Sequence, residues 1–302
     1  MIQGVVIPNL TPMHEHDQSV NLEGLETLVE FLITHKVSAL FVNGTTGEFP
    51  FLSLQERRDC ATLAIKTANK RLPIIVQAGA ATTRDSIDLA VHAAENGADA
   101  VACITPSFFA YSDQELLTFY RDIAKAIHPF KLYLYNIPAR TGNNISLKVA
   151  ETLSHESNIV GIKDSSGNMG QILDYIAIAH FDVLPGADLL ATQALLAGAK
   201  GIVAGPAGIF PEPYIALWQA WQDQDHQTLL YWQKVIMQLS RLIAHGGRLD
   251  LLKGLMAKRL AGIGKVRSPL LAASSQELEG LQQQLKAVLM ATMLEESAYN
   301  WL

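Results

Sequence analysis

Eight short apolar runs recur along the chain. They are continuous rather than alternating, and most of them contain β-branched residues. Continuous apolarity indicates burial on both faces, which is typical of strands in a parallel sheet. The runs start about 18 to 35 residues apart, so a crossover helix fits between most neighbours. They occupy residues 4–8, 39–43, 73–77, 100–104, 131–136, 159–163, 182–186 and 201–205.

The segments between these runs have the period of amphipathic helices. Segments 53–69 and 112–127 each begin with a serine followed three residues later by a glutamate, which is the capping-box pattern. Eight strands that alternate with helices fit a closed (β/α)8 barrel or an open doubly wound sheet. The count of eight favours the barrel, and no G-x-G-x-x-G motif follows the first run. We therefore predict an α/β fold of the (β/α)8 TIM-barrel type.

No strand pattern is found after about residue 225. Residues 225–245, 248–264 and 274–294 instead have helical period. The chain is thus predicted to consist of a (β/α)8 barrel with the catalytic site (1–225) and a C-terminal helical extension (226–302).

Composition excludes several classes of partner. The net charge of -6 argues against a basic nucleic-acid surface, and no stretch of about 18 apolar residues is present to span a membrane. Only two cysteines occur, Cys60 and Cys103, so neither a disulfide framework nor a cysteine zinc site is expected. The N-terminal residues do not have the pattern of a signal peptide. We expect a cytoplasmic protein.

Lys163 is the most informative single residue. It closes the sixth apolar run, where the catalytic end of a barrel would lie. Burial disfavours the ammonium form and lowers its pKa, and a neutral amine can attack a carbonyl to form a Schiff base. A lysine that ends a strand and reaches solvent would fit the same pattern.

Two other strand ends carry candidate polar groups. The turn 44–48 offers the Thr45 and Thr46 hydroxyls and backbone N–H groups that suit a small carboxylate. Tyr135 ends the fifth run and is a candidate for proton transfer. Arg140 follows it and is a candidate for binding a second carboxylate. An ordinary turn, a packing aromatic and a surface arginine are the alternatives.

Together, GTTGE, YNIPARTG and GIKDSS, each at a strand end and in this order, resemble the dihydrodipicolinate synthase / N-acetylneuraminate lyase family. These are pyruvate-dependent class I aldolases, and the resemblance covers about residues 1 to 295. It implies a (β/α)8 barrel, a homotetramer, and a Schiff base between Lys163 and pyruvate without a metal or other cofactor. The substrates would be pyruvate, or a longer 2-keto acid, and a small aldehyde.

The resemblance also implies roles for the remaining candidates. Thr45 and Thr46 would hold the pyruvate carboxylate. Tyr135 would be the proton-transfer phenol, with Thr46 helping to orient it. Gly186 and Val203 would line the pocket.

The motifs do not single out one family member. Arg140 matches the arginine that dihydrodipicolinate synthases use for the carboxylate of aspartate semialdehyde. Those enzymes usually have a Tyr-Tyr pair where this chain has Ser107 and Phe108, and Phe108 has no hydroxyl for a tyrosine relay. A dihydrodipicolinate synthase-like condensation, a 2-keto-3-deoxy sugar acid aldolase and a related dehydratase therefore all stay open. The sialic-acid lyase interpretation is weaker.

Two hypotheses from other classes remain. A metal-dependent barrel lyase would need histidine and carboxylate ligands at several strand ends, where only Asp164 and Asp188 are obvious. A non-catalytic relative that binds a 2-keto acid would keep the fold and the pocket without turnover.

Overall fold

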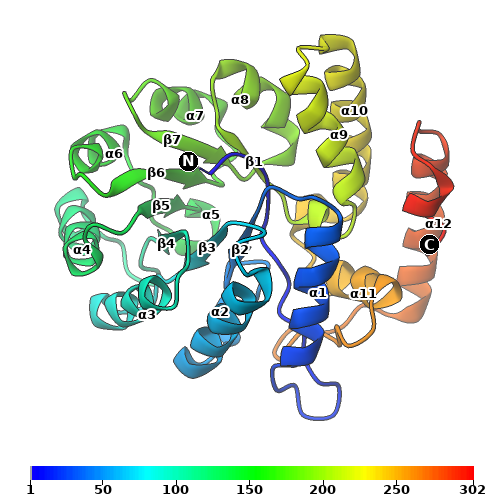
Figure 1. Cartoon of the computed structure of the whole chain (residues 1–302), viewed down its shortest axis with the longest axis horizontal. Helices are drawn as coiled ribbons and strands as arrows, with labels where there is room; N and C mark the ends of the chain where they lie inside the picture. The colour runs from blue at the N-terminus through cyan, green and yellow to red at the C-terminus, as the bar shows by residue number, and fades with distance from the viewer. Residues whose placement is uncertain (1) are drawn as a thin grey trace.

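The computed structural model describes residues 2–302 and forms a barrel of eight parallel strands ringed by helices (Figure 1). Neighbouring strands pair in the order β7-β6-β5-β4-β3-β2-β1-β8. Lys200, just before β8, donates its N–H to Val183 O of β7 at 3.0 Å, and this contact links the first and last strands of that order. The predicted (β/α)8 barrel is confirmed. Its strands are β1 (Gly4–Ile7), β2 (Ala39–Val42), β3 (Ile74–Gln77), β4 (Ala100–Ile104), β5 (Leu132–Asn136), β6 (Ile159–Asp164), β7 (Asp182–Pro185) and β8 (Gly201–Val203).

Side chains alternate between the barrel interior and the helix-facing side. One buried cluster fills the interior and includes Phe41, Ile75 and Tyr135. A second, larger cluster lies between the strands and the helices and includes Leu40 and Val42. Burial on both faces explains why the strands are continuous apolar runs.

Each strand is followed by at least one helix. Both predicted capping boxes are present, because Ser53 and Ser112 accept from the backbone N–H three residues on while the glutamates there accept in return. The helices are α1 (Leu22–Thr34), α2 (Leu54–Ala68), α3 (Thr83–Glu95), α4 (Asp113–Ile127), α5 (Pro138–Thr141), α6 (Leu147–Ser154), α7 (Met169–Ile176), α8 (Ala191–Ala197) and α9 (Pro211–Gln222), with short 3-10 turns η1 (Phe49–Phe51), η2 (Asp188–Leu190) and η3 (Pro206–Gly208).

Three further helices follow the barrel: α10 (His226–Leu242), α11 (Leu249–Arg259) and α12 (Ser275–Met290). In Figure 1, α10 lies beside α9, and α12 forms the outer edge. Arg259 at the end of α11 lies over the Phe31 ring of α1. The 3-10 turns η4 (Ala244–Gly246) and η5 (Glu296–Ala298) complete this part. None of the helices between residues 2 and 302 combines the length and apolarity needed to cross a bilayer.

The segment between α11 and α12 runs back toward the catalytic end of the barrel. Ile263 accepts from the Met13 N–H at 3.0 Å, and the Arg267 guanidinium donates to Gln18 O and Phe51 O at 2.6 to 2.9 Å. The extension is therefore tied to the loops that follow β1 and β2.

Candidate active site

Lys163 lies inside the barrel, at the carboxyl end of β6. Its backbone pairs with Tyr135 on one side and Leu184 on the other, so all three side chains face the interior. The side chain is only 4% exposed. Its Nζ lies 3.9 Å from the centre of the Phe41 ring and 4.0 Å from that of Tyr135. The amine is therefore sequestered from water in an aromatic environment.

Burial is what changes the protonation of Lys163. It lowers the pKa of the amine to about 7, and within residues 2–302 no nearby charge adds to or opposes this shift. Removing an ammonium from water without a carboxylate beside it disfavours the charged form. Near neutral pH, a substantial fraction of Lys163 is thus the free amine that attacks carbonyls.

Tyr135 places a phenol beside this amine. Its Oη lies 3.0 Å from Thr45 Oγ1, and its ring packs edge-on against Phe41. Burial raises the pKa of the phenol to about 12, although hydrogen bonds with Thr45 and Ser165 oppose the rise. The phenol is therefore held in its protonated form, with a hydroxyl partner through which a proton can pass.

The sequence-based expectation assigned the orientation of Tyr135 to Thr46. In the structure, Thr45 makes that hydrogen bond. The Thr46 hydroxyl lies near Gly205 instead, since its Oγ1 would be 3.4 Å from a Cβ placed on that glycine. Neighbouring residues in a tight turn point in different directions, so the sequence does not show which hydroxyl faces the barrel.

Gly186 and Val203 lie where the strands β7 and β8 end. Any side chain at Gly186 would collide with the Ser165 hydroxyl, so the absence of a Cβ lets the ends of β6 and β7 approach. Val203 is buried in the interior cluster with Tyr135 and Leu184. Both residues thus contribute to the packed interior near Lys163.

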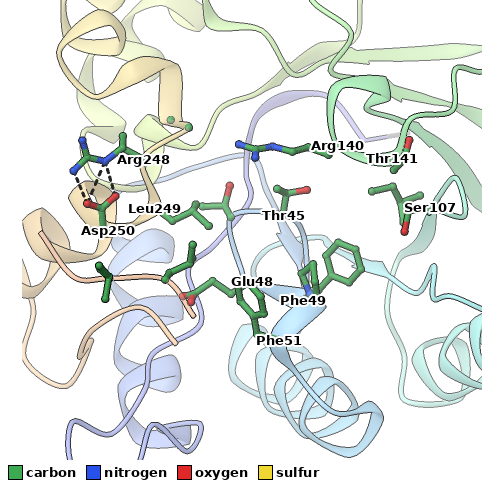
Figure 2. A pocket seen from close by; sticks show the side chains of 17 residues that line it. Thr45, Glu48, Phe49, Phe51, Ser107, Arg140, Thr141, Arg248, Leu249 and Asp250 are labelled. Carbon is green, nitrogen blue, oxygen red and sulfur yellow. Dashed lines mark hydrogen bonds and ion pairs between the residues drawn. The ribbon is translucent and has the colours of Figure 1, made fainter. Parts of the chain in front are cut away.

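A cavity of about 580 Å³ opens at this end of the barrel (Figure 2). Thr45, Thr46 and Arg140 line it, whereas Lys163 and Tyr135 are not part of its wall. Thr45 connects the cavity with the buried Lys163–Tyr135 pair, since it lines the cavity and also contacts the Tyr135 hydroxyl. The remaining wall is mainly apolar, from Phe49, Pro50, Phe51, Ile104, Leu249, Leu270 and Leu271.

Two arginines face this cavity in different electrostatic situations. Figure 2 shows Arg140 beside Thr45, while Arg248 lies on the opposite side in contact with Asp250. Arg248 donates to both Asp250 and Glu277, at 2.6 and 2.9 Å. Arg140 makes no ion pair within residues 2–302, so its guanidinium is available to an anionic ligand.

Ser107 also lines the cavity, but Phe108 does not. Phe108 is 92% exposed, has a positive φ of 80° and stacks edge-on with Phe109. In a single chain it therefore places no group near Lys163. Tyr111 donates its backbone N–H to Asn143 and is likewise outside the cavity wall.

The two strand-end aspartates considered as metal ligands are engaged in hydrogen bonds. Asp164 accepts from Asn136 Nδ2 at 2.8 Å and from Ser166 Oγ at 2.6 Å, and this fixes the loop after β6. Asp188 accepts from Tyr214 Oη and Ser240 Oγ, while burial raises its pKa to about 6. Within residues 2–302, no three histidine, cysteine or acidic side chains are grouped so as to hold a metal.

Sequence reasoning missed several residues of this site. Ser165 and Phe41 touch the Lys163–Tyr135 pair. Ser165 lies within GIKDSS but was given no role, and Phe41 lies in none of the motifs. The wall contributed by residues 246–250 and 270–271 comes from the extension, which sequence patterns assign to a separate helical part. In the sequence, the adjacent glycines Gly246 and Gly247 were the feature that indicated a close approach of the extension's backbone to the cavity.

Comparison with known proteins agrees with this geometry. The model of the dihydrodipicolinate synthetase family matches residues 1–288. The chain belongs to this family. Because the match covers both the barrel and most of the extension, the whole chain is one family member and not a barrel with an unrelated appendage.

Relatives of this family member carry different activities in their names. A 4-hydroxy-tetrahydrodipicolinate synthase from Acidiphilium cryptum is 34% identical over 79% of this chain and 82% of its own length. The putative 2-dehydro-3-deoxy-D-gluconate aldolase YagE of Escherichia coli is 32% identical over 74% and 78%. A dihydrodipicolinate synthase from Acinetobacter baumannii, solved with pyruvate, superimposes with a TM-score of 0.86 and 32% identity over 95% and 99%.

Proposed function

We propose that this protein is a Schiff-base lyase that makes or breaks a carbon–carbon bond between pyruvate and an aldehyde. The observation that carries the proposal is the Lys163 amine, buried without a counter-charge beside a phenol. The pyruvate-bound relative and the family match support pyruvate as the ketone.

The chemistry begins with a condensation. The neutral Lys163 amine adds to the 2-keto carbon of pyruvate, and loss of water gives an iminium ion. The iminium withdraws electrons, so a proton leaves the adjacent methyl group and an enamine forms. The enamine carbon then attacks the aldehyde carbon, and the resulting alkoxide takes up a proton. Hydrolysis of the new iminium releases the product and regenerates the amine.

Specific groups of the site fit these steps. Tyr135 moves the protons, and Thr45 orients its hydroxyl. The turn that bears Thr45 and Thr46 holds the pyruvate carboxylate, so that the reacting atoms stay aligned. Gly186 and Val203 shape the wall near the ketone.

In the condensation direction the second substrate is a small aldehyde, whereas in the cleavage direction a 2-keto-3-deoxy sugar acid is the single substrate. Arg140, which faces the cavity without an ion pair, supports a carboxylate on the aldehyde, as in aspartate semialdehyde. The one carboxylate of 2-keto-3-deoxygluconate becomes that of pyruvate, so this substrate offers none to Arg140. Condensation, cleavage and a related dehydration all begin with a Schiff base on Lys163. A relative that binds a 2-keto acid without turnover is the alternative outcome, since Phe108 supplies no hydroxyl.

Borohydride reduction in the presence of pyruvate tests the proposal. We expect mass spectrometry to find a reduced pyruvate adduct on the Lys163 peptide, and no adduct in Lys163→Met. An adduct on another lysine, or none, would overturn it. Cleavage of 2-keto-3-deoxygluconate, assayed against condensation with aspartate semialdehyde, then separates the substrates. An adduct without turnover of either would favour the binding protein.

We further propose that the protein is a homotetramer. The exposed aromatic pair Phe108 and Phe109 is a surface that another subunit would cover. Sedimentation velocity of the wild-type chain tests the assembly, and a monomer would contradict it.

A further inference from the structure

A buried ion pair lies directly behind the Thr45–Thr46 turn. Glu48, at the end of the turn, has an Oε1 atom 2.6 Å from Lys253 Nζ of α11. Both side chains are inaccessible to solvent, with exposed fractions of 0% and 1%. Lys253 also donates to Lys265 O at 2.8 Å. The pair therefore joins the C-terminal extension to a turn of the barrel.

The backbone of the turn depends on where Glu48 sits. Glu48 has a positive φ of 58°, and its N–H donates to Thr45 O at 3.0 Å. The preceding Gly47 donates to Gly44 O at 3.0 Å and accepts from Thr11 Oγ1 at 2.7 Å. A left-handed conformation at a glutamate is strained, so it persists only where its surroundings hold it. The Lys253 ammonium is one such constraint.

Arg267 holds the other side of the same carboxylate. Its backbone N–H donates to Glu48 Oε2 at 2.8 Å. Its guanidinium donates to Phe51 O and forms two hydrogen bonds with Glu56, the capping residue of α2. One Glu48 oxygen thus forms an ion pair with Lys253, and the other accepts a hydrogen bond from Arg267. The guanidinium of Arg267 also holds the residues that follow the turn.

We propose that Lys253 and Arg267 are positioning residues that fix the Thr45–Thr46 turn for pyruvate binding. A displaced turn would leave the Glu48 carboxylate buried and unpaired, which is costly, so the ion pair restricts the turn to one position. That position sets Thr45 against the Tyr135 hydroxyl. The inference rests on the proposed function, because it concerns the turn that holds the pyruvate carboxylate.

The test measures the pyruvate concentration that gives half-maximal borohydride trapping on Lys163. In Lys253→Met we expect this concentration to rise at least about tenfold, because an error of about 1 Å in positioning can cost about 10²-fold. The maximal extent of trapping and its pH midpoint are expected to stay as in the wild type, because Lys163 itself is unchanged. Lys253→Arg keeps the charge and is expected to restore most of the affinity.

Two further variants keep the test decisive. Arg121→Met breaks the exposed Arg121–Glu156 pair on the outside of the barrel and is the matched control, with unchanged trapping expected. If Lys253→Met does not fold, the double variant Glu48→Gln/Lys253→Met removes both charges and is measured instead, with the same tenfold rise expected.

Three results would overturn the positioning role. They are a folded variant that traps pyruvate at wild-type concentrations, an equal effect in Arg121→Met, and loss of folding in both the single and the double variant. Failure of the proposed function gives a different result, namely no pyruvate adduct on Lys163 in the wild-type protein.

Discussion

Between residues 2 and 302 two lysines are buried, and their surroundings are opposite. Lys163 lies among aromatic rings in the barrel, with no carboxylate beside it. Lys253 lies in the extension against the Glu48 carboxylate. Burial lowers the pKa of both amines, but at Lys253 the charge and hydrogen bond of Glu48 oppose the effect. At Lys163 no described residue opposes the loss of the proton, whereas at Lys253 the neighbouring carboxylate favours the charged form.

The comparison shows that burial alone does not make a lysine reactive. An ammonium that is removed from water must either find a counter-charge or give up its proton. At Lys253 the first solution makes a structural cross-link between distant parts of the chain. At Lys163 the second leaves a free amine, which the proposed function uses as its nucleophile, at a cost in stability that active sites commonly bear.

The largest expected effect concerns turnover. Lys163→Met removes the nucleophile and is expected to lower kcat by at least about 10⁴-fold, since loss of a covalent catalyst is rarely compensated. Steady-state kinetics with the better of the two candidate substrates measures this. If Lys253→Arg, which keeps its charge, lost as much activity as Lys163→Met, the distinction between the two lysines would fail.

The second effect separates proton transfer from Schiff-base formation. Tyr135→Phe keeps the ring that packs on Lys163 but removes the hydroxyl, and we expect kcat to fall by about 10²- to 10⁴-fold. Borohydride trapping of pyruvate is expected to persist in this variant, because the amine is intact. Loss of trapping as well would show that the phenol is needed for the condensation itself.

The third effect is on the free energy of unfolding, which the two lysine variants are expected to change in opposite directions. Lys253→Met leaves Glu48 buried and unpaired and is expected to lower the free energy of unfolding by about 3–5 kcal/mol. Lys163→Met removes an unpaired buried amine and is expected to raise it by a few kcal/mol near pH 6. Urea unfolding of both variants at matched pH checks this, and shifts of the same sign would contradict the comparison.

The pH dependence of this stabilisation follows from the lowered pKa of Lys163. Between pH 7 and the usual lysine value of 10.5, the unfolded chain binds a proton that the folded chain does not. The penalty of burying Lys163 is therefore complete below pH 7 and fades as the pH rises toward 10.5. The gain in Lys163→Met is expected to fade in the same range.

The smallest effect is on the rate of Schiff-base formation. With a pKa of about 7, roughly a tenth of Lys163 is the free amine at pH 6 and roughly nine tenths at pH 8. The initial rate of pyruvate trapping at subsaturating pyruvate is expected to rise roughly tenfold between these values. A rate that kept rising to pH 10 would mean that the amine has an ordinary lysine pKa.

Much of the fold could be predicted because its signal is local. Continuous apolar runs mark strands covered on both faces, and the serine–glutamate spacing marked where α2 and α4 begin. The position of Lys163 at the end of β6 followed from the same periodicity. Its lack of a counter-charge did not follow, because a carboxylate from any part of the chain could have been brought beside it.

The barrel, its eight strand ends and the residue types at these ends follow from patterns along the chain. Which groups meet depends on the folded structure: Thr45 rather than Thr46 contacts Tyr135, and residues of the extension lie in the cavity wall. The folded structure also decides that Lys253 finds Glu48 while Lys163 finds only aromatic rings. The reason is physical, since hydrophobic period is read along the chain, whereas desolvation and charge pairing depend on distances in space between residues far apart in sequence.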